Sequence, residues 1–408
     1  MAILSKICIL SIAALAYVDA AELLKVAKDV EIIPKSYIVA MKGNVNDLDF
    51  QSHTASIASI HHENLAKRGS SSAGGLKFVY NVHNWKGYSG SFDEDTLRQI
   101  LNDPKVDYVE HDRIVKAFVE PSVGPASLET QKNVPTWGLP RISHKKGGSR
   151  DYVYDSKAGE GITIYGVDTG IDATHPDFEG RVTWGGNFVG GGNRDGHGHG
   201  THTSGTFGSK TYGVAKKAKI VAVKVLNERS QGSLGGIMMG INWAVSHAKQ
   251  NNITNKAVMN LSLGAKGSNS LNAVATNAVQ AGIFLSVASG NDNTNAQSYT
   301  PASAKGVCAI SASSQNDAKA GFSNYGSIIS LYAPGDKIVS LKPGGSTQVM
   351  SGTSMAAPHV AGAAAVLMSV EGLEVSKVCD RLKELGNPAI SNPGAGTTNK
   401  LLYNDSGE

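Results

Sequence analysis

Ile162-Thr163-Ile164-Tyr165-Gly166-Val167 is a near-continuous apolar run that ends directly before Asp168. Runs of the same kind follow at residues 220–225, 257–261 and 283–287, and helical stretches such as residues 235–249 lie between them. Strands that are apolar on both faces and alternate with helices are typical of a parallel sheet covered by helices on both sides. We therefore predict an α/β fold with a mostly parallel sheet, and we expect functional side chains where the strands end.

The part of the chain before this sheet, residues 21–126, has the pattern of a small α+β unit. Strand signals at residues 36–41, 78–82 and 106–110 alternate with a polar helical stretch and with a helix that opens at Asp93-Glu94-Asp95. This order suits a small ferredoxin-like sandwich. Residues 120–127 are rich in Pro, Gly and Ser, as linkers are. We therefore expect one domain over residues 21–126 and a second over residues 127–408.

The N-terminus has the order of a secretory signal. Lys6 precedes an apolar run over residues 7–16, and small residues ending at Ala20 follow. A membrane span needs roughly 20 apolar residues, which this run does not reach. We predict a signal peptide over residues 1–20, an extracellular protein and no membrane partner. The net charge is only +4 over 408 residues and is spread along the chain, so we expect no nucleic-acid partner either.

Three segments carry residues suited to catalysis. Gly166-Val167-Asp168-Thr169-Gly170-Ile171-Asp172 places Asp168 after a strand, although turn aspartates are common there. Asp195-Gly196-His197-Gly198-His199-Gly200-Thr201-His202 supplies imidazoles, which exchange protons near neutral pH. The alternative for this second segment is a zinc site made of its three histidines. Ser351-Gly352-Thr353-Ser354-Met355-Ala356-Ala357-Pro358-His359-Val360-Ala361-Gly362 places Ser354 before an apolar helix, where a serine more often serves as the N-cap.

The three segments together favour nucleophilic catalysis over each of these alternatives. A serine is a poor nucleophile unless a base removes its proton. The base in turn needs a third group that fixes its tautomer and stabilises its cation. Asp168, His199 and Ser354 are candidates for these roles, and their order along the chain is that of subtilisin.

The same three segments resemble the signature segments of the subtilases. Residues 127–408 are similar to the proteinase K branch, including secreted fungal subtilisins of the dermatophyte kind, and residues 36–118 resemble the inhibitory propeptide of these enzymes. The resemblance implies that Asn291 is an oxyanion-hole donor and that Ser262-Leu263-Gly264 and Gly290 contact substrate, with residues 231–234 as the opposing edge. A strand edge that binds peptide main chain tolerates many substrate sequences.

The cysteines fit an exported protein. Cys8 leaves with the predicted signal, and an even number, Cys308 and Cys379, remains. From the residues alone these are either one disulfide or two buried thiols. The resemblance implies the disulfide. It also implies a cysteine shortly after the catalytic histidine, and this chain has Thr203 there instead.

The resemblance further implies a calcium site built from backbone oxygens near Val307 and one carboxylate. Simple alignment puts Ser330 at the carboxylate position. Calcium prefers charged oxygen ligands, so this ligand set is incomplete, and we assign no metal ligands. We expect no cofactor to be required for the chemistry.

Three glycosylation sequons begin at Asn252, Asn260 and Asn404. Asn260 lies in a predicted buried strand, so we expect sugar only at Asn252 and Asn404.

Taken together, these features predict a secreted, monomeric serine endopeptidase of broad specificity, made as a self-processing zymogen. Its partners would be protein and peptide substrates and its own propeptide, which would inhibit it within the same chain. Two other functions compete with this one. One is a zinc hydrolase that uses His197, His199 and His202, and the other is a degenerate subtilase that binds proteins without cleaving them.

Overall fold

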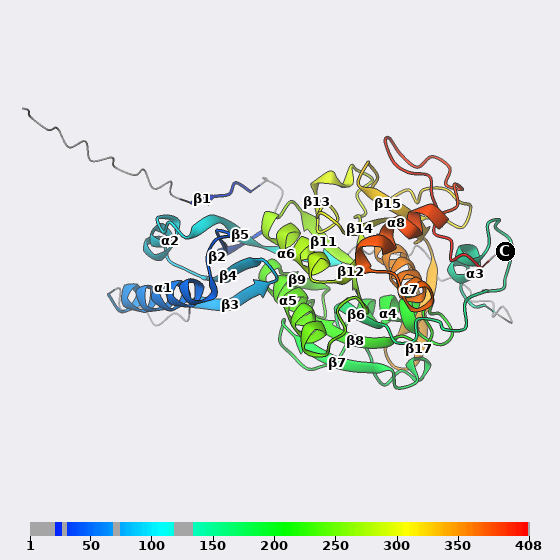
Figure 1. Cartoon of the computed structure of the whole chain (residues 1–408), viewed down its shortest axis with the longest axis horizontal. Coiled ribbons are helices and arrows are strands. Elements are labelled where there is room, and N and C mark those ends of the chain that lie inside the picture. Colours follow the sequence, from blue (N-terminus) through cyan, green and yellow to red (C-terminus); the bar gives the residue numbers. More distant parts are fainter. Residues whose placement is uncertain (1–20, 27–30, 68–73, 118–133, 407–408) are drawn as a thin grey trace, which may run out of the picture.

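The computed structural model describes residues 21–26, 31–67, 74–117 and 134–406. The predicted signal peptide and the predicted boundary between the two domains lie outside these ranges. Figure 1 shows the N-terminal α+β unit (blue to cyan) at one end of the molecule, packed against the larger α/β unit that follows it.

A parallel sheet forms the centre of the larger unit. Within the described residues it has seven strands in the order β15-β14-β12-β10-β6-β8-β7, and every neighbouring pair is parallel. The strands are β6 (Thr163–Asp168), β7 (Val182–Asn187), β8 (Lys219–Lys224), β10 (Ala257–Leu261), β12 (Ile283–Ala288), β14 (Cys308–Ser313) and β15 (Ile329–Pro334). The four runs identified in the sequence are β6, β8, β10 and β12, and the predicted parallel sheet is confirmed.

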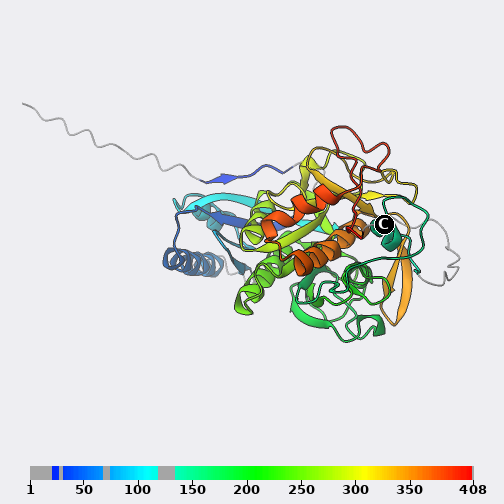
Figure 2. The same cartoon turned by 45° about the vertical axis from the view of Figure 1, so that its right-hand side comes forward.

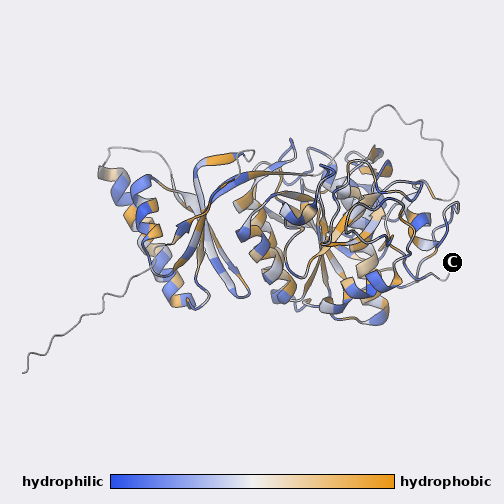
Figure 3. Cartoon of the chain, turned by 90° about the horizontal axis from the view of Figure 1, so that it is seen from above, coloured by the Kyte–Doolittle hydropathy of each residue, from blue (hydrophilic) through white to orange (hydrophobic). Residues whose placement is uncertain are grey.

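Helices cover both faces of this sheet. Successive side chains of a strand point to opposite faces, so Tyr165 and Val167 of β6 join the core under α5 (Leu234–Gln250) and α6 (Asn269–Gln280). Ile164 joins the core under α4 (His199–Gly208), α7 (Thr353–Glu371) and α8 (Val375–Leu385). Figure 2 shows α7 and α8 crossing this second face, and in Figure 3 the apolar residues concentrate in the sheet and its helices.

Helix α7 is the most apolar of these helices. Among the described residues it is the one helix long and apolar enough to cross a membrane, but 89% of its apolar window is buried inside the protein. It therefore has the burial of a core helix.

The N-terminal unit is a β-α-β-β-α-β sandwich. Its elements are β2 (Ile32–Met41), α1 (Asp47–Lys67), β3 (Gly75–Val82), β4 (Trp85–Ser91), α2 (Glu94–Leu101) and β5 (Val106–Ala117). The sequence did not predict β4, because glycine and serine dominate it. Gly87 is needed at its position, since a Cβ there would lie 2.6 Å from the carbonyl oxygen of Val39 on the neighbouring strand.

Strand β5 connects the two units. Its first half pairs with β2, and its second half lies between two short strands of the larger unit, β9 (Gln231–Ser233) and β11 (Leu263–Lys266). Both pairings are antiparallel, with Lys116 opposite Gln231 on one side and opposite Gly264 on the other. The predicted strand at residues 106–110 thus continues to Ala117 and fills the space between the two predicted substrate-binding edges.

The remaining elements are small. They are β1 (Glu22–Leu23), α3 (Gly138–Ser143), η1 (Pro176–Phe178), η2 (Ala296–Ser298), β13 (Tyr299–Thr300), β16 (Ile338–Lys342) and β17 (Ser346–Met350).

Candidate active site

Asp168 and His199 lie in contact at the carboxyl end of the parallel sheet. Asp168 is the last residue of β6, and His199 is the first residue of α4. The imidazole Nδ1 lies 2.7 Å from Asp168 Oδ1, and both side chains are fully buried. The backbone N–H of Thr169 donates to the same carboxylate oxygen at 2.7 Å. The carboxylate therefore fixes the ring so that Nδ1 faces Asp168 and Nε2 points away from it.

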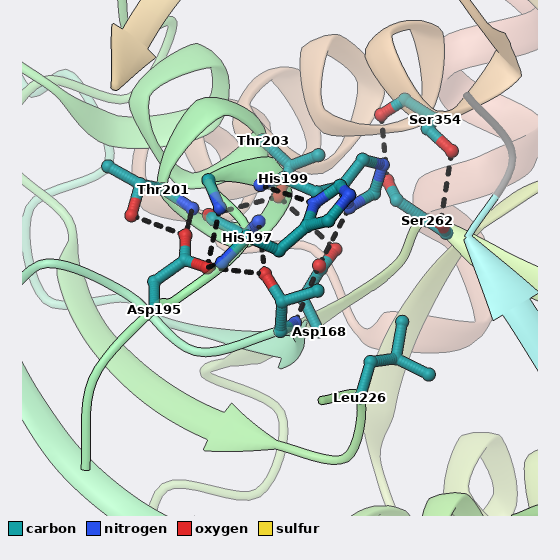
Figure 4. A network of polar contacts seen from close by, with 12 residues as sticks. Asp168, Asp195, His197, His199, Thr201, Thr203, Leu226, Ser262 and Ser354 are labelled. Carbon is teal, nitrogen blue, oxygen red and sulfur yellow. Dashed lines mark hydrogen bonds and ion pairs between the residues drawn. The ribbon is translucent and has the colours of Figure 1, made fainter. Parts of the chain in front are cut away.

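Ser354 is the second residue of α7, on the other side of His199 from Asp168 (Figure 4). The residue before the helix, Gly352, has φ of +152°, a value that a side chain would strain. The Ser354 hydroxyl donates to the carbonyl oxygen of Ser262 at 3.0 Å, and the Ser262 hydroxyl donates back to the carbonyl oxygen of Ser354 at 2.8 Å. His199 Nε2 is buried and has no hydrogen-bond partner among the described residues.

Asn291 lies beside the start of α7 and is held by the residue before Ser354. Its Oδ1 accepts hydrogen bonds from the backbone N–H and the hydroxyl of Thr353, at 3.0 and 2.8 Å. Its Nδ2 is buried without an acceptor among the described residues. An amide fixed by its oxygen presents two N–H donors to whatever oxygen enters the site. Sequence reasoning named Asn291 but missed Thr353, although Thr353 stands inside the quoted motif.

The predicted substrate-contacting residues lie next to this group. Ser262 directly precedes β11, and Leu263 and Gly264 of β11 pair with β5. Gly290 precedes Asn291 and donates its N–H to the Thr353 hydroxyl at 3.1 Å. The opposing edge, β9, pairs with the other side of β5. An extended peptide main chain between β9 and β11 thus meets hydrogen-bonding groups on both sides.

The three histidines of the second motif do not converge on a common point. His197 is exposed, and its Nδ1 accepts the N–H of His199. His202 is fully buried, and its Nε2 bonds to the carbonyl oxygen of Ile338 at 3.0 Å. Burial lowers the pKa of His202 to about 3. Within the described ranges no three His, Cys, Asp or Glu side chains are grouped so as to hold a metal ion, so the geometry does not support the zinc alternative.

The implied calcium site fits this chain poorly. Ser330 offers a hydroxyl where a carboxylate is expected, and Ca²⁺ prefers anionic oxygen ligands.

Two acidic side chains hold the N-terminal unit on the larger one. Glu110 Oε1 accepts hydrogen bonds from Ser268 Oγ and from the N–H of Ser270, at the start of α6. Asp112 Oδ1 accepts the N–H of Gly235, at the start of α5. Carboxylates favour helix N-termini, where N–H groups lack helical acceptors. Sequence reasoning missed both residues. The pattern that could have revealed them is their spacing of two positions, which places both carboxylates on one face of β5.

Cys308 and Cys379 form a disulfide with 5.8 Å between their Cα atoms, as the resemblance implied.

The other predicted positions differ in accessibility. Asn252 is exposed, whereas Asn260 is fully buried. The Asn404 Nδ2 donates to the carbonyl oxygen of Val153 at 2.8 Å. Thr203, at the position of the implied cysteine, is fully buried, and its hydroxyl lies 3.4 Å from Asp168 Oδ2.

Comparison with known proteins finds a matching family for each of the two units. The model of the Subtilase family matches residues 159–382, and that of Peptidase inhibitor I9 matches residues 36–118. A subtilisin-like protease of Coccidioides posadasii (strain C735) is 55% identical over 406 residues, covering 98% of this chain and 99% of that protein. Subtilisin-like protease 3 of Trichophyton equinum is 53% identical over 403 residues, covering 99% of each.

A solved structure extends the comparison to three dimensions. The crystal structure of a cold-adapted subtilisin-like serine proteinase matches with a TM-score of 0.62 at 37% identity, covering 66% of this chain and 97% of that one. The larger unit therefore has the subtilisin-like fold. From these matches over both units, the chain belongs to the subtilase family, as a subtilisin-like serine endopeptidase that carries a peptidase inhibitor I9 propeptide.

Proposed function

We propose that the protein is a secreted endopeptidase of broad specificity that cleaves peptide bonds through an acyl-enzyme on Ser354. The disulfide between Cys308 and Cys379 supports export, because such bonds persist in oxidising compartments. We assign residues 1–20 to a signal peptide, residues 21–126 to the propeptide and residues 127–408 to a monomeric catalytic domain. Among the sequons we favour Asn252 over Asn404, because the Asn404 side-chain nitrogen already donates to a carbonyl.

The chemistry we propose is acyl transfer in two steps. Ser354 Oγ attacks the carbonyl carbon of the substrate while His199 Nε2 takes its proton, and Asp168 stabilises the imidazolium. The oxyanion receives hydrogen bonds from Asn291 Nδ2 and from the Ser354 backbone N–H. His199 then protonates the leaving amine, which departs. A water molecule then gives a proton to His199 and attacks the carbonyl carbon of the acyl-enzyme. The bond to Ser354 Oγ breaks, the carboxylic acid leaves, and His199 returns the proton to Ser354 Oγ.

The observation that carries this proposal is the hydrogen bonding of the two ring nitrogens of His199. Its Nδ1 is bound to Asp168, while its Nε2 is buried without a partner among the described residues and faces the side on which Ser354 lies. A buried nitrogen without a hydrogen-bond partner costs free energy, so its presence in a folded protein calls for an explanation. Proton acceptance from Ser354 provides that explanation.

The hydrogen bond from Ser354 to Ser262 suggests how substrate completes the site. Leu263 and Gly264 already pair with a peptide strand, so one more substrate residue would bring a main-chain N–H to the Ser262 carbonyl. That N–H would compete with the Ser354 hydroxyl for the same oxygen. The hydroxyl could then turn about χ1 toward His199 Nε2. Catalytic hydrogen bonds are commonly long or misaligned before substrate binds and tighten in the complex.

Main-chain pairing also supports broad specificity. Strands β9 and β11 bind β5 through backbone groups, which every substrate offers irrespective of sequence. The propeptide strand occupies this position in the precursor, so the same site would cleave its own chain before it meets other substrates.

Expression of the full chain with Ser354→Ala tests the proposal. Wild type should release its propeptide, should hydrolyse casein and should be labelled by a serine-directed phosphonyl reagent. The variant should accumulate as an intact precursor, and Ser351→Ala, next to the same helix, is the matched control that should still process itself. A Ser354→Ala precursor that cleaves itself and hydrolyses peptides would overturn the assignment.

A further inference from the structure

We propose that Asp195 is a positioning residue which, through Thr169, holds the imidazole of His199 against Asp168. Neither residue touches the reacting atoms. The inference rests on the proposed catalytic triad and adds to it the parts that set the distance between its acid and its base.

Asp195 is a buried carboxylate that is surrounded by hydrogen-bond donors. It is 7% exposed and accepts five hydrogen bonds: Oδ1 from Thr169 Oγ1 and from the N–H groups of His197 and Gly198, and Oδ2 from the N–H and hydroxyl of Thr201. The distances lie between 2.6 and 3.1 Å. The carboxylate thus binds both the loop before His199 and the first turn of α4, as Figure 4 shows.

Thr169 joins this carboxylate to the two segments that carry the proposed acid and base. It follows Asp168 in sequence, and its hydroxyl donates to Asp195 Oδ1 at 2.8 Å. The same hydroxyl accepts the N–H of Gly200, the residue after His199, at 2.9 Å. One fully buried hydroxyl therefore fixes the neighbour of Asp168 to the neighbour of His199.

The main chain of Thr169 is held as firmly as its side chain. Lys224 is fully buried at the end of β8, and its ammonium group donates to the carbonyl oxygens of Thr169 and Leu226, at 2.7 and 2.8 Å. Thr169 is thus bound by an anion at its side chain and by a cation at its carbonyl. This arrangement limits movement of the peptide that carries Asp168, in a site where small displacements of reacting groups cost large factors in rate.

The competing explanation is that Asp195 only caps α4. The first N–H groups of α4 go to His197 Nδ1, Thr169 Oγ1 and Asp195 Oδ2, and a carboxylate at a helix start stabilises the helix. The two explanations differ for the two threonines that donate a hydroxyl to Asp195. The Thr201 hydroxyl donates to Asp195 and accepts the N–H of Asp172, whereas the Thr169 hydroxyl donates to Asp195 from the residue that directly follows Asp168.

The test compares Thr169→Val with Thr201→Val in the full chain. Each removes one hydroxyl that donates to Asp195 and keeps the side-chain shape. We expect Thr169→Val to slow self-cleavage of the precursor and to lower kcat on a peptide substrate about 10- to 100-fold, with KM changed less than about 2-fold. Thr201→Val should lower the melting temperature but leave kcat within about 2-fold of wild type. Thr169→Ser, which keeps the hydroxyl, should restore the rate.

A second readout does not depend on turnover. In the Ser354→Ala precursor the proton on His199 Nδ1 should give a downfield NMR resonance, because it is hydrogen-bonded to a carboxylate. Thr169→Val and Asp195→Asn should move this resonance upfield and broaden it, and Thr201→Val should leave it in place. Equal effects of Thr169→Val and Thr201→Val on kcat and on this resonance would overturn the inference. Failure of the proposed function would look different, since the wild-type chain itself would then neither process itself nor react with a serine reagent.

Discussion

The carboxamide oxygen of Asn291 lies 2.8 Å from the hydroxyl and 3.0 Å from the backbone nitrogen of Thr353, the residue that precedes Ser354. These two bonds leave only one orientation for the amide, with Nδ2 directed away from Thr353. The proposed oxyanion donor is therefore set by the helix that carries the nucleophile, and any movement of the start of α7 would move both together. Such preorganisation lets a donor stabilise developing charge without reorienting during the reaction.

Asn291→Leu should therefore act on the rate and not on substrate affinity. We expect kcat to fall by about 100- to 1000-fold with little change in KM, which is the loss measured when the corresponding donor is removed from subtilisin. Steady-state kinetics on a chromogenic peptide measure both constants. An unchanged kcat in a folded Asn291→Leu enzyme would remove Asn291 from the oxyanion hole.

Thr353→Val is the companion to that variant. It removes the hydroxyl bonds to Asn291 and Gly290 but keeps the Thr353 N–H, so Asn291 retains one of its two anchors. We expect a smaller loss of kcat, up to about 10-fold, in keeping with the loss of one of the two hydrogen bonds that hold Asn291. Thr353→Ser should recover most of it.

The predictions from sequence succeeded where a pattern depends on local order. The apolar runs of β6, β8, β10 and β12 indicate buried parallel strands without further information. Asp93 likewise marks the start of α2, of which it is the N-cap. The order of Asp168, His199 and Ser354 suggested one site, but no spacing in the sequence gives the 2.7 Å contact between the first two.

The features that the sequence did not predict share one physical cause. The residues that stabilise each of them lie far away in the chain. Strand β4 is rich in glycine because the strands beside it approach closely, and this contact is invisible in its own composition. The second half of β5 is a strand because β9 and β11 pair with it from more than a hundred residues away. The roles of Thr169 and Asp195 likewise follow from bonds across 26 positions.

Glu110→Gln should shorten the time for which the cleaved propeptide keeps the enzyme inactive. Glu110 accepts two hydrogen bonds at the start of α6, and its other oxygen accepts from Arg113 at 2.7 Å. Hydrogen bonds to a charged group contribute about 1.5–3 kcal/mol each, so losing the charge should speed release about 10-fold or more. The lag before full activity after processing measures this. Glu94→Gln, an exposed carboxylate on α2, is the control that should leave the lag unchanged.

The pH dependence of propeptide stability should depend on His53. This side chain of α1 is 4% exposed, and its ring nitrogens bond to Asp103 at 2.8 Å and to the hydroxyl of Tyr88 at 3.0 Å. Burial lowers the pKa of His53 below its ordinary value of 6.5, and this outweighs the attraction of Asp103, which raises it.

The sign of the effect follows from proton counting. Between the lowered pKa and 6.5 the unfolded propeptide binds more protons at His53 than the folded one does, so the contribution of His53 to stability rises with pH in this window and is lost as pH falls through it. The loss is at most about 1.4 kcal/mol per pH unit. Hydrogen exchange of β4 in the Ser354→Ala precursor, corrected for intrinsic rates, measures it at pH 7 and pH 5. His53→Gln cannot titrate and should flatten the dependence, whereas His62→Gln, exposed on the same helix, should not. Equal pH dependence in wild type and His53→Gln would show that other groups control acid destabilisation of the propeptide.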